Sequence, residues 1–258
     1  MDRSDIKKLN PVEFQKLFIA MNEEVRHRDD PENSYINWYY TPDPCITEYL
    51  DELKNFLEID NPTKQLRRET GYLLEKILVV AFKGLVGYSE IKSYRSGSCQ
   101  LDLLISGDGL QWNSICNLIH QANEFSRGII VEAKAERSRV SSAQFSRLCN
   151  IMNINFCNTV GLGIFFTLEG ASGFPAKGGS RVIGFKDSRL CQLLFYAKTN
   201  KKIIVLDKND ILELDRNGSL IRIIISKVKE IEEASGLPTV STEEIIDIDL
   251  PDYLKDIM

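Results

Sequence analysis

Two short segments of the chain combine apolar residues with charged ones. Residues 99–105 are Cys-Gln-Leu-Asp-Leu-Leu-Ile, and residues 128–136 are Gly-Ile-Ile-Val-Glu-Ala-Lys-Ala-Glu. Their short apolar and β-branched runs predict strands. Because side chains alternate across a strand, Glu132 and Lys134 share one face, and Asp102 joins them if the two strands pair. Two carboxylates and an ammonium on an apolar sheet are costly to bury, unless a cation and an anionic substrate bind there.

This pattern resembles the active site of the PD-(D/E)xK nucleases, also called restriction-endonuclease-like. In that family an Asp and a Glu hold a divalent metal, and the Lys positions or activates the attacking water. The resemblance implies these roles for Asp102, Glu132 and Lys134. The sequence departs from the strict family pattern in one place, and a long insertion loosens the match. Leu101 stands where the family name has Pro, and the long interval before Glu132 contains a predicted helix at about 110–124.

The residue types fit hydrolysis of a phosphodiester. Hard oxygen ligands favour Mg²⁺ or Mn²⁺ over zinc. The metal would polarise the scissile phosphate and lower the pKa of a bound water. Lys134 would stabilise the developing negative charge or orient that water.

An upstream helix offers a further acid. Residues 63 to about 86 have the period of an amphipathic helix, in which Glu75 falls inside the apolar stripe and Gly71 allows close approach to the sheet. In many of these nucleases, including the Mrr-type restriction family, a helix before the first core strand offers a Glu to the metal. The resemblance therefore implies that Glu75 is a third ligand. The alternative is that Glu75 lies at the edge of the stripe and reaches water.

A simpler interpretation of the central motif stays open. Glu132 and Lys134 would then be a solvated pair on an edge strand, and Asp102 an unrelated surface acid. Such a short pattern arises by chance in charged chains. The Ile-Ile-Val run that follows Gly128 favours a buried central strand instead.

Basic residues follow the motif. Residues 137–153 have the pattern of a loop running into a helix with a basic outer side, and residues 170–180 form a loop rich in Gly. The residues that we expect to bind DNA are Arg137, Arg139, Arg147 and Lys177. Gln144 resembles a polar residue that many family members carry near the metal. It is a secondary candidate, as is Gln100, which shares the face of Asp102.

The remaining pattern indicates the fold class. Strands are predicted at Val160–Thr167 and 201–207, and helices at 186–198 and 220–233. The order of elements predicts an α/β fold with a mixed central sheet flanked by helices. The resemblance makes this a restriction-endonuclease-like core with an N-terminal helical extension. We expect a helical cap for recognition or dimerisation at 1–60, the nuclease core at 61–233, and an acidic C-terminal tail at 234–258.

The charge is unevenly distributed. The chain of 258 residues carries a net charge of −5, but residues 203–258 hold 13 acids and 6 bases. Residues 176–202, in contrast, hold seven Lys or Arg and one acid, Asp187. This run predicts either a basic face for nucleic acid or an ordinary solvated surface. The acidic tail could shield that face or bind a partner protein.

Composition also indicates the cellular compartment of the protein. The six Cys are scattered without a C-x-x-C pair and there are only two His, which argues against a zinc site. No apolar run reaches the roughly 18 residues of a membrane span, and the N-terminus does not have the pattern of a signal peptide. We expect a cytoplasmic protein with reduced thiols and no membrane partner.

The sequence as a whole predicts a Mg²⁺-dependent DNA endonuclease, and the resemblance implies a role in restriction or phage defence. Two alternatives stay open: a nuclease that acts on structured DNA or RNA or as an exonuclease, and a non-catalytic nucleic-acid-binding or dimerisation module with the same fold. A homodimer is also predicted, because cutting both strands with one site per chain favours a symmetric pair. Trp112, Ile115 and Ile119 would need a partner surface unless they cover the sheet of their own chain.

Overall fold

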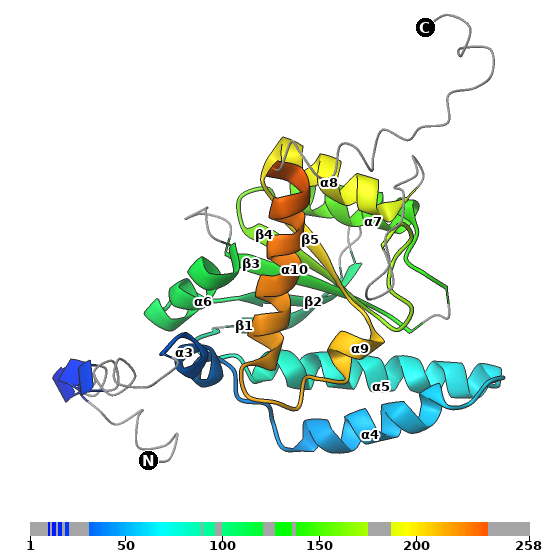
Figure 1. Ribbon diagram of the computed structural model, residues 1–258, viewed down its shortest axis with the longest axis horizontal. Helices are drawn as coiled ribbons and strands as arrows, with labels where there is room; N and C mark the ends of the chain where they lie inside the picture. The colour runs from blue at the N-terminus through cyan, green and yellow to red at the C-terminus, as the bar shows by residue number, and fades with distance from the viewer. Residues whose placement is uncertain are drawn as a thin grey trace, which may run out of the picture.

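The chain forms an α/β structure around one mixed sheet (Figure 1). The computed structural model describes residues 10, 12–13, 15–16, 19–20, 31–88, 90–95, 100–120, 127–135, 138–174 and 187–236. Its five strands lie in the order of the sequence, β1-β2-β3-β4-β5. They are β1 (Glu90–Arg95), β2 (Gln100–Ser106), β3 (Gly128–Lys134), β4 (Val160–Thr167) and β5 (Lys202–Leu206). Within the described residues no helix is long and apolar enough to cross a membrane.

The sheet changes direction at β3. Strands β1, β2 and β3 pair antiparallel as a meander, whereas β3, β4 and β5 pair parallel. Parallel neighbours need a crossover connection. The connection from β3 to β4 contains α7 (Ser142–Asn150) and the short π-helix η1 (Ile151–Asn155), and that from β4 to β5 contains α8 (Ser188–Thr199). The expectation of a mixed sheet flanked by helices is confirmed.

One face of the sheet carries the larger core. Its helices are α3 (Pro31–Tyr39), α4 (Cys45–Leu57), α5 (Lys64–Lys83), α6 (Leu110–His120), α9 (Lys208–Ile211) and α10 (Ser219–Gly236). Figure 1 shows α10 across the front of the sheet and α4 alongside α5. This core includes Ile129 and Val131 of β3. The opposite face packs Ile130 of β3 and Phe165 of β4 against α7, η1 and α8.

Residues 31–60 share the larger core with the predicted nuclease core. Ile46, Leu50 and Leu53 of α4 are buried there with the helix α5. Tyr40 is fully buried, and its hydroxyl donates a hydrogen bond to the carbonyl of Leu214, 2.8 Å away. The hydrophobic core therefore continues across the predicted boundary at residue 60. Most of residues 10–30 and all of the tail beyond 236 lie outside the described residues.

The insertion helix α6 covers its own sheet. Trp112, Ile115 and Ile119 are fully buried in the larger core. The Trp112 indole donates a hydrogen bond to the carbonyl of Arg127, just before β3. These three side chains are therefore not an exposed surface that needs a partner, and the homodimer stays a prediction without their support.

The basic run before β5 is partly structural. Lys201 is buried, and its ammonium donates to the carbonyls of Met152, in η1, and Cys157, just after it, at 2.8 and 2.7 Å. Burial lowers the Lys201 pKa. Lys202 is also buried and forms an ion pair with Glu232. Neither side chain belongs to an exposed basic face, which corrects that part of the sequence interpretation.

Candidate active site

Glu132 is the unusual residue of β3. The strand is an apolar run in which every residue from Gly128 to Glu132 is buried, and the Glu132 side chain retains only 5% of its accessible surface. Its neighbours Val131 and Ala133 contact the larger core, so Glu132 and Lys134 project to the opposite face, where α7 lies. A buried carboxylate needs compensating partners.

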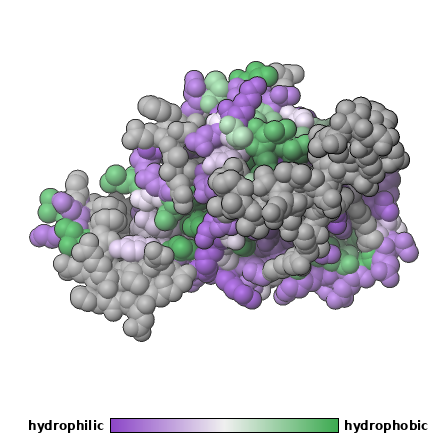
Figure 2. Space-filling view, turned by 45° about the horizontal axis from the view of Figure 1, so that its top comes forward, coloured by the Kyte–Doolittle hydropathy of each residue, from purple (hydrophilic) through white to green (hydrophobic). Residues whose placement is uncertain are grey.

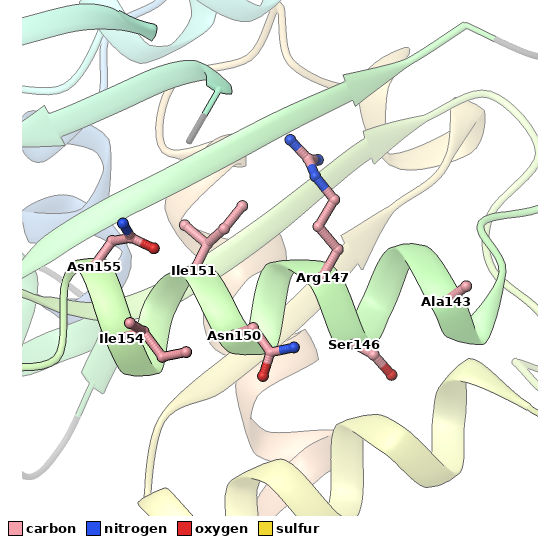
Figure 3. A pocket seen from close by; sticks show the side chains of 7 residues that line it. All are labelled: Ala143, Ser146, Arg147, Asn150, Ile151, Ile154 and Asn155. Atoms are coloured by element: carbon pink, nitrogen blue, oxygen red, sulfur yellow. The ribbon is translucent and has the colours of Figure 1, made fainter. Parts of the chain in front are cut away.

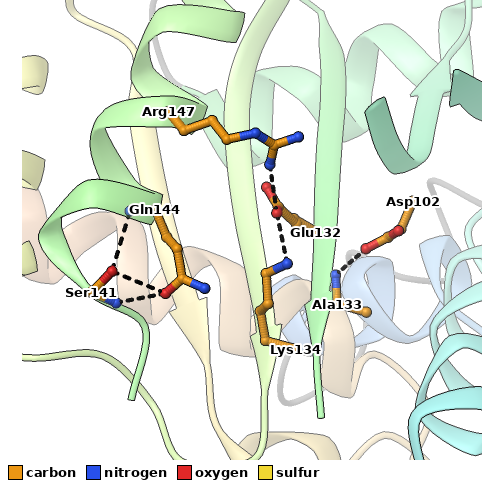
Figure 4. A network of polar contacts seen from close by, with 7 residues as sticks. All are labelled: Asp102, Glu132, Ala133, Lys134, Ser141, Gln144 and Arg147. Atoms are coloured by element: carbon orange, nitrogen blue, oxygen red, sulfur yellow. Dashed lines mark hydrogen bonds and ion pairs between the residues drawn. The ribbon is translucent and has the colours of Figure 1, made fainter. Parts of the chain in front are cut away.

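The two carboxylate oxygens of Glu132 have different surroundings. Oε1 accepts from the Lys134 ammonium at 2.9 Å and from the Arg147 guanidinium of α7 at 2.8 Å. Figure 4 shows Glu132 between these two cations. Oε2 is buried and has no hydrogen-bond partner among the described residues. An unpartnered carboxylate oxygen in the interior costs free energy, unless a ligand binds to it.

Asp102 lies where the pairing of β2 and β3 ends. The ladder joins Ile105 to Ile129 and continues as far as Leu103 opposite Val131. Beyond this pair the Asp102 side chain accepts the backbone N–H of Ala133 through Oδ2 at 2.7 Å (Figure 4). Because Leu103 and Val131 both face the larger core, the next residues along the two strands, Asp102 and Glu132, belong to the other face.

The N-terminus of α7 holds the next part of the site. Ser141 caps the helix and forms a capping box with Gln144, whose side-chain oxygen accepts from the Ser141 backbone N–H at 2.8 Å. Gln144 therefore has a structural role that explains its presence without a metal. Figure 4 nevertheless places its amide on the same side of the sheet as Lys134, so it stays a secondary candidate.

Glu75 does not lie in the buried stripe of α5, and that sequence expectation is wrong. Glu75 is exposed, whereas Leu74, Ile77 and Leu78 are buried. The helix packs against α4 as well as the sheet, so its apolar stripe is rotated away from Glu75. Gly71 lies next to Ala135, which follows β3, but a Cβ there would make an ordinary contact of 3.8 Å with the Cβ of Ala135, so the packing does not require glycine. No three His, Cys, Asp or Glu side chains of the described residues group as a metal site.

A shallow hollow adjoins Arg147 along the outer side of α7 and η1. It is lined by Ala143, Ser146, Arg147, Asn150, Ile151, Ile154 and Asn155 (Figure 3). Arg147 points from this helix toward the strands, while Ser146 and Asn150 point to the other side. Figure 2 brings the α7–α8 end of the molecule forward and shows hydrophobic areas broken by hydrophilic ones. The hollow thus offers a mixed lining with one cation that also contacts Glu132.

The other predicted DNA contacts are only partly placed. Arg139 is exposed just before α7, and the Arg147 side chain is 47% exposed. Arg137 and Lys177 lie outside the described residues. Gln100 begins β2, but its side chain is outside what the structure describes.

Sequence reasoning missed two features of this site. The pairing of Arg147 with Glu132 joins residues on different elements. Their opposite charges were the only signal of it in the sequence. Thr167, at the end of β4, is fully buried with a hydroxyl that has no partner among the described residues. A polar residue at the end of a wholly apolar strand was the signal that could have drawn attention to it.

Comparison with models of protein families, with curated proteins and with solved structures gives no match for this chain. The functional argument therefore depends on the residues and geometry of the site.

Proposed function

We propose that the chain is a metal-dependent nuclease of the PD-(D/E)xK, restriction-endonuclease-like class, which hydrolyses phosphodiester bonds in DNA. One observation carries the proposal: the buried carboxylate of Glu132 has one oxygen bound by two cations, and its other oxygen has no hydrogen-bond partner among the described residues. This is the arrangement expected of a metal ligand held ready for its ion. Restriction or phage defence is the biological role that the resemblance implies.

The arrangement of the strands supports the proposal. Asp102 lies on β2 and the Glu132-Ala133-Lys134 triplet on β3, which are adjacent antiparallel strands of a mixed sheet flanked by helices. The motif residues therefore come from neighbouring strands, as the resemblance requires. The simpler interpretation placed Glu132 on a solvated edge, whereas β3 is the central strand and Glu132 is buried.

The residues present fit a hard divalent cation. Glu132 offers Oε2, and Asp102, which accepts the hydrogen bond from Ala133 through Oδ2, offers Oδ1. Two carboxylates suffice for Mg²⁺, which keeps several waters and takes its remaining ligands from substrate phosphates. Asp102 and Glu132 would hold the ion. When bound, Mg²⁺ or Mn²⁺ supplies Lewis-acid polarisation of the phosphate and a water of lowered pKa.

The cations of the site have separate tasks in this proposal. Lys134 is anchored by its ion pair to Glu132 and stabilises the negative charge that develops on the phosphate, or orients the attacking water. Arg147 joins the carboxylate to the hollow along α7 and η1, where a phosphate next to the scissile one would bind. Arg139, exposed just before α7, would bind a further phosphate. These residues neutralise phosphates without reading bases.

The test is incubation of the purified chain with supercoiled plasmid in Mg²⁺, Mn²⁺ or EDTA. We expect nicked or linear product with either ion and none with EDTA. Parallel reactions with linear duplex, single-stranded DNA and RNA distinguish an endonuclease on DNA from the alternatives. A matched control is Glu213→Gln, which removes an exposed acid from the segment after α9 and should cut at the wild-type rate.

A non-catalytic nucleic-acid-binding module is the second candidate. The observation that favours it is that Lys134 and Arg147 already balance the charge of Glu132 without a metal. Under this alternative the chain binds DNA equally well in Mg²⁺ and EDTA and cuts none of the four substrates. The same set of reactions, run with a gel-shift measurement, separates the two functions.

A further inference from the structure

The first turns of α5 carry a cluster of exposed cations. Residues 64–72 are Lys-Gln-Leu-Arg-Arg-Glu-Thr-Gly-Tyr, which contain three bases and one acid. Arg67 and Arg68 are exposed, and neither forms an ion pair within the part of the chain that the structure describes. The one acid, Glu69, accepts a hydrogen bond from the side chain of Gln65 at 2.9 Å. This part of the helix surface therefore keeps a net positive charge.

The cluster lies near the end of β3 that carries Lys134. Ala135 directly follows Lys134, and a Cβ built on Gly71 would lie 3.8 Å from the Cβ of Ala135. Arg67 and Arg68 precede Gly71 by about one helical turn, so they lie on the same side of α5 as Gly71, roughly 5 Å further along its axis. Figure 1 shows the first turns of α5 extending beyond the strands. The two arginines are thus accessible from solvent close to the candidate site.

Tyr72 holds the Arg68 side chain in place. Arg68 Nε donates a hydrogen bond to the Tyr72 hydroxyl at 2.8 Å, and Arg68 Cζ lies 5.5 Å from the centroid of the ring. A guanidinium has five N–H donors, so this bond leaves four for an anion. The next acid along the helix, Glu75, lies about two turns further on. Because Arg68 is already ordered, binding an anion costs less side-chain entropy.

We propose that Arg67 and Arg68 bind DNA phosphates beyond those at the scissile bond, and that Tyr72 is a positioning residue for Arg68. The inference rests on the proposed nuclease function for the identity of the ligand. Guanidinium groups match phosphate in both charge and geometry. The α7 side of the sheet already carries Arg139 and Arg147. With α5 on the opposite face, cations lie on both sides of the edge where β3 ends, and the bound DNA spans that edge.

The experiment compares the wild type with the double variant Arg67→Gln/Arg68→Gln. Its matched control is Lys76→Gln/Lys83→Gln, which removes two exposed charges from the C-terminal half of the same helix. Lys83 lies about 22 Å along the axis from Arg68. Tyr72→Phe removes only the hydroxyl that holds Arg68. Melting temperature establishes folding for each variant, and the two single arginine variants replace the double variant if it does not fold.

Binding is measured by fluorescence anisotropy of a fluorescein-labelled DNA duplex across a salt titration, in EDTA, which prevents metal-dependent cleavage, and in Ca²⁺. Each phosphate contact contributes about 0.9 to the slope of log Kd against log salt concentration. The slope of the double variant should therefore be smaller by about 1.8, so that between about 50 and 200 mM salt the wild type loses roughly tenfold more affinity than the variant. The lysine control should keep the wild-type slope.

Two further readouts distinguish the roles of these residues. Tyr72→Phe should keep the wild-type slope but bind roughly two- to tenfold more weakly, because Arg68 must then be ordered on binding. In Mg²⁺-dependent plasmid cleavage the double variant should raise KM and leave kcat unchanged, as expected for contacts that are equal in the ground state and the transition state.

The outcomes separate the two proposals. An unchanged slope in the double variant, or an equal loss of slope in the lysine control, overturns the phosphate site on α5 and leaves the nuclease proposal intact. If the wild type binds the duplex but cuts no substrate, the nuclease proposal fails, and the slopes still decide the site on α5. Absence of duplex binding in both EDTA and Ca²⁺ overturns that site. Wild-type affinity in Tyr72→Phe overturns the positioning role of Tyr72.

Discussion

Replacing Glu132 by Gln removes one negative charge from the site and preserves the shape of the side chain. Two opposing effects on stability follow. The bonds from Lys134 and Arg147 to Oε1 cease to be charge-assisted, which costs about 1 kcal/mol each. The penalty for burying a carboxylate, several kcal/mol per ion, is removed at the same time. The two effects offset each other, and we expect the free energy of unfolding to change by less than about 2 kcal/mol.

The rise in Tm caused by Mg²⁺ shows whether Glu132 is a metal ligand. Mg²⁺ at about ten times its dissociation constant stabilises the folded state by about 1.4 kcal/mol. For a chain of this length that corresponds to a rise of roughly 3–6 °C in Tm. Loss of a ligand should weaken binding at least about tenfold, since even groups that only support the ligands matter that much. At the same Mg²⁺ concentration the Glu132→Gln protein would then gain about 0.4 kcal/mol, or roughly 1–2 °C.

The assay is differential scanning fluorimetry of wild type, Glu132→Gln and Glu213→Gln across a Mg²⁺ titration, with Ca²⁺ and EDTA as references. Glu213→Gln should follow the wild-type curve, because it removes an exposed acid remote from the site in sequence. An equal Tm rise in wild type and Glu132→Gln would refute the assignment of Glu132 as a ligand. No rise in the wild type at millimolar Mg²⁺ or Mn²⁺ would refute the metal site itself.

Three further predictions follow from the structure. Lys134→Met should lower the cleavage rate at least about 100-fold while Tm changes little, because Arg147 still pairs with Glu132; cleavage at the wild-type rate would exclude Lys134 from the chemistry. Glu75→Gln should leave both the Mg²⁺-induced Tm rise and the cleavage rate unchanged, because Glu75 is exposed; a loss comparable to that of Glu132→Gln would make Glu75 the third ligand after all. Burial raises the pKa of the Cys116 thiol from 9.0 to about 12. The stability that the neutral buried thiol gives the folded state is therefore complete below pH 9, and it is lost at higher pH as the unfolded thiol ionises. The stability advantage of wild type over Cys116→Ser should therefore shrink by about 1.4 kcal/mol in urea unfolding between pH 8 and pH 10, and a constant difference would contradict this.

The sequence predicted the strands that carry the motif because their patterns are local. An apolar run after Gly128 indicated a buried strand, and alternation then placed Glu132 and Lys134 on one face. Val160–Thr167 was predicted with the bounds that β4 has. The edge strand β1, Glu-Ile-Lys-Ser-Tyr-Arg, was missed, since its polar and charged residues suit an exposed edge as well as a loop.

Features that depend on tertiary packing could not be predicted from local sequence patterns. The period of α5 indicated a helix, but its rotation is set by contacts with both α4 and the sheet, and Glu75 lies outside the buried stripe for that reason. Lys201 and Lys202 belonged to a charged run that suggested a surface, yet both are buried by partners far away in the sequence. Asp102 was placed on the correct strand, but its bond to Ala133 depends on where the ladder ends.

The most direct test of the central claim is a crystal structure of the chain with Mn²⁺, in which anomalous scattering locates the ion. The account predicts one ion with carboxylate oxygens of both Asp102 and Glu132 about 2.0–2.6 Å away, and with Oε2 of Glu132 among them. An ion bound elsewhere, or two carboxylates held more than about 8 Å apart, would contradict it, since ligands at such distances cannot share a cation.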